Sequence, residues 1–376
     1  MCSRKELNFR QRSSEISVFE ATSETVDRPP SDRQLDPTKA VKKYRRSAAG
    51  GVSKEQQYPP RSLDALYRTV EYLTDLLIHW QRTTTLPPAS SFLDLVHFVE
   101  DRLRAVQVDL VISQYASKEI QYKIVQIHIL TMYVLTDTSK YERRHGKKAL
   151  HTALSSYWNQ STRVETDDEI LALTAMMQLD EDLSRLDAHP EDYSDHTHGA
   201  GILALYRKHV DPKDTQLPQK LPRFQWVLRV ISCCNTGEWS NALRLLHQEC
   251  RQQENSMFGV RVACLLAPSL VRIRAKALQA YNVSLMKNEQ LADAEVARLL
   301  SISHPAVAVQ LCSQLHLPVG DNNEMVSFKS APIHMEWTKR TKRDDAFVFG
   351  GQEVKAATDL NGTRIPDDTF LSTFFK

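Results

Sequence analysis

Glycine is scarce in this chain. It accounts for 11 of 376 residues, about 3%, where globular proteins use about 7%. Because glycine serves tight turns, bulges and left-handed positions, its scarcity argues against turn-dense β-sandwiches and against glycine-rich phosphate loops. The sequence also contains no GxSxG, Walker, HExxH or GxGxxG motif. We therefore expect a helical protein that is not an enzyme and has no cofactor and no small-molecule substrate.

Long apolar runs and paired cysteine motifs are missing as well. No stretch approaches the roughly 18 apolar residues of a membrane helix, and the opening MCSRKELNFRQR is charged where a signal peptide needs an apolar core. The six cysteines show no CxxC spacing, and four lie in apolar helical stretches, as reduced core cysteines do. These features predict an intracellular protein without a membrane span or a metal site. The net charge of +2 allows nucleic-acid binding only through local basic patches.

Apolar residues follow a helical period over most of the chain. Residues 1–60 are polar and predict an extended arm with a short helix or two. Residues 61–282 predict a right-handed α-solenoid of stacked helix pairs, TPR-like or PCI-like, in an all-α fold. The expected helices cover residues 63–80, 91–114, 118–135, 146–158, 166–180, 199–209, 223–235, 239–253 and 259–281.

The pattern changes after residue 283. A short helix is expected over 291–300, and Pro305 begins a second helix that runs through His316. Apolar residues then flank the polar turn Gly320–Asn323, which predicts a hairpin. Two short helices followed by a hairpin predict a small winged-helix domain over 283–335. Residues 336–376 are expected to be a charged, flexible tail.

Three stretches of the sequence carry a resemblance to a known family. The segment Asp36–Ala49, here called the 36–49 signature, is similar to D-P-x-x-A-V-K-x-Y-x-R-S-x-A, and Phe98–Leu110 is similar to a helix of pattern F-x-x-x-R-x-R-x-x-x-x-D. The third resemblance lies at the start of the chain, in Met1-Cys2, Glu6, Arg10, Ile16 and Phe19-Glu20. With the helical corner at 223–281 and the terminus at 290–330, these features resemble the Sac/GANP family over residues 1–335.

The resemblance implies a function as well as a PCI-like fold. Members of the family are scaffolds of the nuclear transcription–export complex at the nuclear pore. The resemblance therefore implies a non-catalytic mRNA-export protein in the nucleus, with a PCI-domain subunit and a small acidic peptide subunit as partners. A short animal member is linked to centrosome duplication, so a cytoplasmic or centrosomal protein of the mitotic spindle is the alternative. Composition does not choose between these two roles.

Two basic clusters are candidate contacts to single-stranded RNA. In the first, five cations surround an aromatic residue, which suits phosphate binding with base stacking; its members are Lys39, Lys42, Lys43, Tyr44, Arg45 and Arg46. The other interpretation is that this segment docks on the helices, with Val41 and Tyr44 pointing inward. The second cluster follows the expected hairpin and comprises Lys339, Arg340, Lys342 and Arg343.

The second helix of the expected winged helix, His304–His316, contains no lysine or arginine. Base reading in a groove is therefore not expected, and pairing with another subunit is favoured. The apolar residues on this helix exceed what one buried face needs, so we predict partner binding through Val307, Val309, Leu311 and Leu315. In the helix at 91–114, Asp101, Arg102, Arg104 and Asp109 are expected to form a solvated face with local pairs such as Asp101 with Arg104.

Overall fold

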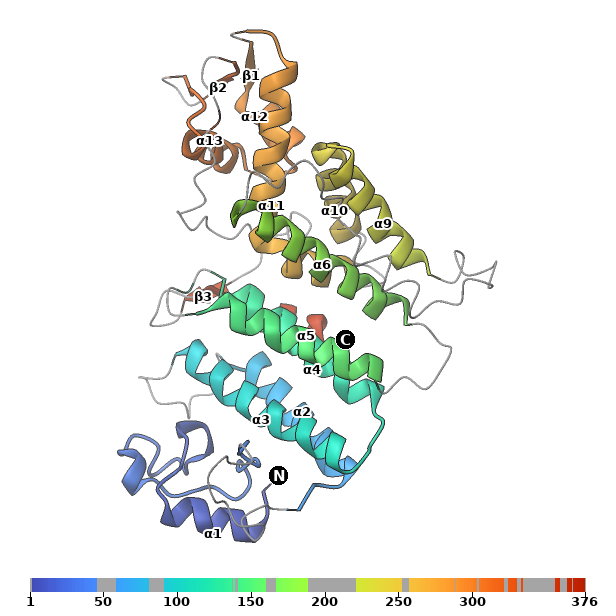
Figure 1. The fold of residues 1–376 in the computed structure, drawn as a ribbon. Helices are drawn as coiled ribbons and strands as arrows, with labels where there is room; N and C mark the ends of the chain where they lie inside the picture. Colours follow the sequence, from blue (N-terminus) through green and yellow to red (C-terminus); the bar gives the residue numbers. More distant parts are fainter. Residues whose placement is uncertain are drawn as a thin grey trace, which may run out of the picture. The chain divides into compact units, whose positions relative to one another are not determined.

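The apolar stripes of the sequence form helices in the computed structural model of the protein (Figure 1), which is mostly helical, as predicted. The structure describes residues 2–45, 59–80, 91–136, 138, 141–159, 167–188, 221–251, 257–287, 289–302, 304–320, 324–329, 333, 356–358, 364–366 and 368–375. The chain divides into two compact units. Unit 1 comprises Met1–Thr162 and Lys355–Lys376, and unit 2 comprises Arg163–Val354. The division falls inside the predicted span 61–282, and the arm belongs to the same unit as the helices that follow it.

Unit 1 begins with the arm and continues into four longer helices. The arm contains α1 (Arg4–Arg12) and the 3₁₀ turns η1 (Val18–Glu20) and η2 (Pro30–Asp32). The helices are α2 (Leu63–Ile78), α3 (Phe92–Ile112), α4 (Lys118–Val134) and α5 (Arg143–Asn159). As predicted, Ser91 and Asp94 form a capping box that begins α3. Helix α4 packs against both α2 and α5 and is buried over most of its surface, as its continuous apolar sequence predicted.

Unit 2 is built from helices that pack in sequence order. Helix α6 (Asp168–Ala188) packs against α9 (Pro222–Asn235) and α11 (Phe258–Ser284), and α10 (Trp239–Arg251) packs against the same two. The predicted corner between α9 and α10 is present, with Gly237 at a φ of 77°, a left-handed conformation that suits glycine after a helix. The predicted helix at 199–209 lies outside the described residues.

An ion-pair group orients the first helices of unit 2. The Asp168 carboxylate accepts hydrogen bonds from the backbone N–H groups of Arg223 and Phe224, both at 2.9 Å, and so caps α9. Beside it, the buried Glu169 pairs with Arg223 at 3.0 Å and Arg261 at 2.7 Å. The starts of α6, α9 and α11 are therefore joined by one acidic pair.

The end of unit 2 contains a small sheet. Strand β1 (Gln290–Ala292) pairs antiparallel with β2 (Met325–Ser327), and a bridge joins Val319 to Val326. Between them lie α12 (Asp293–Leu299) and α13 (Pro305–Gln314), which pack together. The sequence predicted a helix from residue 291, but residues 290–292 form a strand because β2 supplies their hydrogen-bonding partners. The local periodicity of a sequence carries no information about a strand partner more than thirty residues away.

The C-terminal residues differ from the predicted flexible tail. Residues 356–375 include β3 (Ala356–Thr358), β4 (Arg364–Pro366) and α15 (Asp368–Phe374). Strands β3 and β4 pair antiparallel, and α15 packs against α2. Leu371, Phe374 and Phe375 are buried. The expectation of a flexible tail is therefore wrong for its last residues, because three apolar side chains close together supply enough apolar area to hold a short segment on the helices.

Two expectations about environment can be compared with the structure. Among the helices that it describes, none combines the length and apolar composition that a membrane crossing requires. All six cysteines are free, and the side chains of Cys234, Cys250, Cys264 and Cys312 are buried, as predicted for core cysteines.

A buried histidine in α4 makes the stability of unit 1 sensitive to acid. Burial, together with the positive charge of Arg104, lowers the pKa of His128 to about 4. In the unfolded chain the pKa is near the ordinary value of about 6.5, so the unfolded state binds a proton first as the pH falls. The contribution of neutral His128 to the stability of unit 1 is therefore present above pH 6.5 and is lost as the pH falls toward 4.

We predict that His128→Leu reduces the acid sensitivity of folding. Between pH 7 and pH 5 the wild-type protein should lose about 2 kcal/mol of unfolding free energy through this group, and the variant should be spared that loss. Urea unfolding at both pH values measures the difference. His151→Leu, at an exposed position of α5, is the matched control and should behave as the wild type. An equal loss in His128→Leu and wild type would mean that His128 does not stay neutral in the folded protein.

Candidate functional site

The arm is held on α3 by a group of charged side chains, here called the arm junction: Glu6, Arg10, Glu20, Asp101, Arg102 and Asp109. All of them are buried except Asp101, which is half-buried. Helix α1 places Glu6 and Arg10 one turn apart on one face, and both are buried. The turn η1 buries Glu20 together with Phe19. The Phe19 ring lies against Phe98 of α3, with ring centroids 5.2 Å apart. The sequence of the arm thus supplies both the apolar contact and the charges.

Glu20 is the centre of the arm junction. One of its oxygens accepts hydrogen bonds from Arg10 at 3.2 Å and from the backbone N–H of Val41 at 2.9 Å. The other accepts from Arg102 of α3 at 2.7 Å and from Arg10. Burial alone would raise the pKa of Glu20, but the charge of Arg102 and the hydrogen bond and charge of Arg10 outweigh it and lower the pKa. Glu20 is therefore a carboxylate that joins α1, the 36–49 signature and α3.

The backbone of the 36–49 signature is fixed by the same group of acids. The backbone N–H of Lys43 donates to Glu6 at 2.9 Å, and that of Tyr44 donates to Asp101 at 3.3 Å. The carbonyl of Val41 accepts from Arg10 at 3.1 Å. Val41 itself is fully buried. Two backbone N–H groups and one backbone carbonyl of this segment thus form hydrogen bonds with side chains of α1 and α3.

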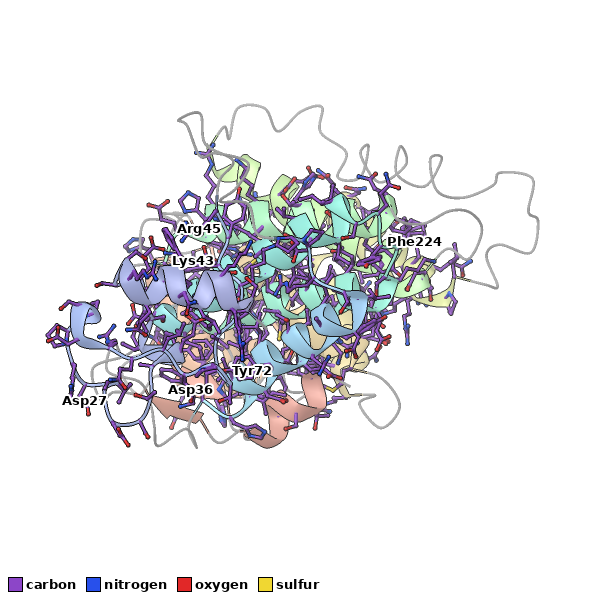
Figure 2. The ribbon with its side chains drawn as sticks, turned by 90° about the horizontal axis from the view of Figure 1, so that it is seen from below. Asp27, Asp36, Lys43, Arg45, Tyr72 and Phe224 are labelled. Carbon is purple, nitrogen blue, oxygen red and sulfur yellow. The ribbon has the colours of Figure 1, made fainter. Side chains whose placement is uncertain are left out.

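The side-chain cations of residues 36–45, the part of the signature that the structure describes, lie in ion pairs. Lys42 pairs with the buried Asp109 at 2.6 Å, and Arg61 reaches the other oxygen of that carboxylate at 2.7 Å. Lys43 and Arg45, both labelled in Figure 2, pair with Glu15 at 3.0 and 3.3 Å. Burial would raise the pKa of Glu15, but the hydrogen bond and charge of Lys43 and the charge of Arg45 lower it.

The other members of this cluster are less enclosed. Lys39 lies 3.7 Å from Asp36 within the arm, and the Arg45 guanidinium lies 4.3 Å from the centroid of the Phe9 ring. Tyr44 is half-buried. Arg46, together with Lys339, Arg340, Lys342 and Arg343, lies outside the described residues. RNA contact by these clusters remains a prediction, and the described cations of the first cluster already have carboxylate partners with which a phosphate would compete.

Two charged residues of α3 do not lie where the sequence analysis placed them. Arg102 and Asp109 are buried, and Arg102 pairs with Glu20 and Asp101. The expectation of a solvated charged face is therefore wrong for these two positions. The signal that was missed is their spacing: both fall on the same helical stripe as the buried Val99 and Val106. A charge at a core position of a helix indicates a buried partner from elsewhere in the chain.

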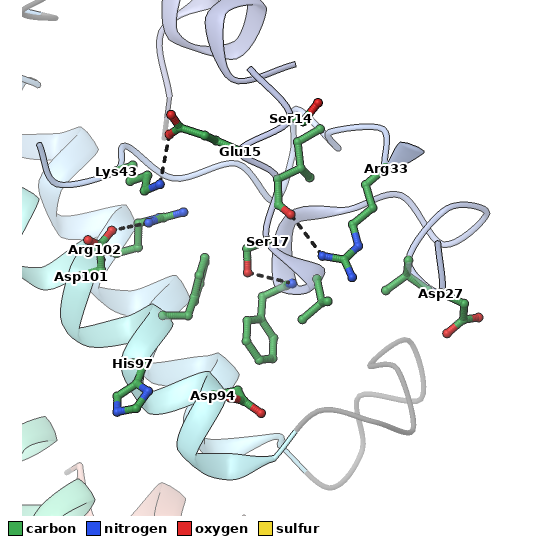
Figure 3. A pocket seen from close by; sticks show the side chains of 15 residues that line it. Ser14, Glu15, Ser17, Asp27, Arg33, Lys43, Asp94, His97, Asp101 and Arg102 are labelled. Carbon is green, nitrogen blue, oxygen red and sulfur yellow. Dashed lines mark hydrogen bonds and ion pairs between the residues drawn. The ribbon is translucent and has the colours of Figure 1, made fainter. Parts of the chain in front are cut away.

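An open groove runs between the arm and the first half of α3. It has a volume of about 890 Å³. Figure 3 shows Arg33 and Asp27 of the arm on one side, and Asp94 and His97 of α3 on the other. Its floor includes the paired rings of Phe19 and Phe98. Among the described residues, no three histidine, cysteine or acidic side chains are grouped as a metal site would require.

Helix α2 also borders the arm. The Tyr72 hydroxyl is buried without a hydrogen-bond partner in the described part of the chain. Burial, followed by the negative charges of Glu20 and Asp36, raises the pKa of Tyr72 (Figure 2). Tyr72 therefore stays neutral and is not a source of charge at the arm junction.

The predicted partner-binding residues of α13 differ in accessibility. Val309, Leu311 and Leu315 are buried inside unit 2, whereas Val307 is 40% exposed. Most of the surplus of apolar residues that the sequence indicated is therefore buried within unit 2, where α13 packs against α12. Only Val307 among the four offers a partner a largely accessible side chain.

We predict that Glu20→Gln detaches the arm. The substitution keeps the shape of the side chain but removes the buried carboxylate that pairs with Arg10 and leaves Arg102 with Asp101 alone. Breaking a buried ion pair in this way costs about 3–5 kcal/mol. Urea unfolding should report this loss, and trypsin should cut at Lys42, Lys43 and Arg45 faster than in the wild type. Asp36→Asn, which removes a partly exposed pair, should cost less than about 1 kcal/mol. If Glu20→Gln is as stable and as resistant as Asp36→Asn, the arm is held by apolar packing alone.

The comparisons with known proteins match the part of the chain that contains the arm junction. The model of the SAC3/GANP family matches residues 1–321, a span that contains the arm, α3 and most of unit 2. The chain is also similar to SAC3 family protein B of Arabidopsis thaliana, with 22% identity over 328 residues, or 83% of this chain. The match covers 17% of that relative's length. Since the family match extends over far more than half of the sequence, the protein belongs to the SAC3/GANP family.

Proposed function

We propose that the protein is a non-catalytic scaffold of a nuclear transcription–export complex that acts in mRNA export. The observation that supports this best is the use of charge at the arm junction. The residues that resemble the family's motifs, such as Glu20, Arg102 and Asp109, pair with one another and with the arm. Their chemistry holds a large helical surface together, which is the requirement of a protein that assembles others.

The architecture that goes with this function is a right-handed α-solenoid ending in a winged helix. In unit 1, α2 packs against α3 and α4, and α4 packs against α5; in unit 2, α9 packs against α10 and α10 against α11. Neighbouring helices in solenoid repeats pack in this way. The order β1-α12-α13-β2, with β1 and β2 paired and a further bridge at Val319, supports the winged helix.

A PCI-domain subunit is the partner proposed for the end of unit 2. Apolar side chains are exposed there at Val283 in the last turn of α11, at Met286 just after it, and at Val307 on α13. Backbone N–H of Lys329 donates to Asn282, so the end of α11 and the strand β2 belong to one surface. A small acidic peptide subunit is proposed as a further partner, and the nucleus, at the nuclear pore, as the site of action.

Affinity purification of the full chain at low salt tests this function. The expected result is copurification of a PCI-domain protein with a small acidic subunit. Val307→Asp should abolish it, because a charge would be buried in the interface. Val111→Asp, at a 71% exposed valine of unit 1, is the matched control and should retain the partner. Recovery of centrosomal or spindle proteins in place of these subunits would contradict the export function and support the alternative role in centrosome duplication.

RNA binding, as part of this function, should be electrostatic and independent of sequence. We predict that charge reversal of the cluster Lys339, Arg340, Lys342 and Arg343 weakens binding to all single strands about equally. Affinity should fall with salt at a log–log slope of about −0.7 for each phosphate neutralised. Fluorescence anisotropy with two unrelated RNA sequences measures both effects. Reversal of four exposed cations elsewhere is the control: Lys118, Arg144, Lys148 and Arg229. Equal losses in the two variants would show that net charge, and not this cluster, governs binding.

A further inference from the structure

The C-terminal helix occupies a groove formed by α2 and α4. Leu371, Phe374 and Phe375 of this segment are buried, and the last two rings meet edge to face with centroids 5.4 Å apart. Lys123 of α4 donates a hydrogen bond to the backbone carbonyl of Phe375 and lies 5.8 Å from the centre of its ring. Figure 2 shows α15, in pale red, beside α2, in pale blue. Three buried side chains and the Phe375 carbonyl thus take part in anchoring this segment.

Helix α15 has the form of a peptide ligand. It is seven residues long, and isolated helices of that length are not stable in water. Its anchors at Leu371, Phe374 and Phe375 follow i, i+3, i+4 spacing, the pattern by which short amphipathic helices bind apolar grooves. Nothing in its own length stabilises α15, so the groove must supply the stability.

The groove is larger than α15. A cavity of about 250 Å³ remains beside Phe375, and its apolar lining includes Val70, Ile78 and Ile120. The same cavity is bordered by the carboxylates of Glu71, Asp75 and Glu119. All three residues are exposed, and within the described part of the chain none of them forms an ion pair. An occupant with an apolar side chain bulkier than that of Phe375 would fill the cavity, and a basic residue beside it would pair with the carboxylates at the rim.

We propose that the groove between α2 and α4 is a docking site for a short amphipathic helix of a partner protein. The partner helix carries apolar anchors spaced as in Leu-x-x-Phe-Phe, flanked by basic residues that face Glu71, Asp75 and Glu119. Helix α15 occupies the groove when the partner is absent. The site lies within unit 1 and does not depend on the export function proposed above.

Competition with α15 sets the expected size of the effect. A tethered occupant acts at an effective concentration in the millimolar range, so it reduces the apparent affinity for any peptide from outside. Removing the anchors of α15 from the chain should raise that affinity at least about tenfold, because the competent groove is then always open.

The test uses a fluorescent peptide with the sequence of residues 364–376 as the probe. In anisotropy titrations it should bind the wild-type chain weakly and the Phe374→Ala/Phe375→Ala chain at least about tenfold more tightly. A peptide carrying the same two alanines should not bind. Equal affinity of the two peptides for the variant chain would overturn the proposal, because binding would then not use the anchors.

The acidic rim is tested with peptides that carry two additional lysines or two additional glutamates at the C-terminal end. The lysine peptide should bind more tightly, and Glu71→Lys/Asp75→Lys in the chain should reverse that preference. Glu24→Lys/Glu142→Lys, at two other exposed acids, is the matched control and should leave the preference unchanged. A preference that is the same in all three chains would rule out the basic partner helix.

Hydrogen exchange on the wild-type chain keeps the proposal testable if the double alanine variant does not fold. Saturating lysine peptide should remove the protection of the amides of residues 368–375, since the peptide displaces α15. Protection that persists at millimolar peptide would show that α15 is a permanent part of the core and would overturn the proposal.

Discussion

The arrangement of unit 1 depends on one buried carboxylate. Glu20 accepts hydrogen bonds from Arg10, Arg102 and the backbone of Val41, so three segments separated in sequence meet at its two oxygens. A buried charge is tolerated only when its partners are in place. The buried carboxylate therefore contributes little to the net free energy of folding. Its effect is on the path of the arm, because any shift in register would leave two guanidinium groups and a carboxylate buried apart.

The same reasoning explains which parts of the fold could be predicted from the sequence. Helices α2, α3 and α4 follow from apolar spacing and caps, both of which are local. Strand β1 was missed because its partner β2 lies in another part of the sequence. The end of the chain was expected to be flexible because residues 336–376 are charged and have few apolar residues. In both cases the interaction that decides the structure joins distant residues, and local patterns carry no information about it.

The candidate site was predicted in part, for a related reason. Charge and aromatic content identified the cluster from Lys39 to Arg46, and docking of Val41 was one of its two interpretations. The acidic partners were not identified: Asp109 was assigned to a solvated face, although it shares a helical stripe with Val106. Ionisable residues at core positions of a helix are informative because their burial is costly without a partner. Read in this way, the pattern F-x-x-x-R-x-R-x-x-x-x-D marks an internal interface, formed by Arg102 and Asp109, and not a surface.

The arm and the C-terminal helix are bound to unit 1 by different kinds of interaction, and this difference bears on function. The arm is attached by buried ion pairs, which require several groups to be placed together and so select one geometry. The contacts described for α15 include its apolar anchors and a hydrogen bond from Lys123 to a backbone carbonyl, and another sequence of similar spacing can reproduce such contacts. Exchange of an occupant is therefore compatible with the groove of α2 and α4 and incompatible with the arm junction. A scaffold needs both properties: one segment that fixes its surface, and another surface that can be offered to a partner.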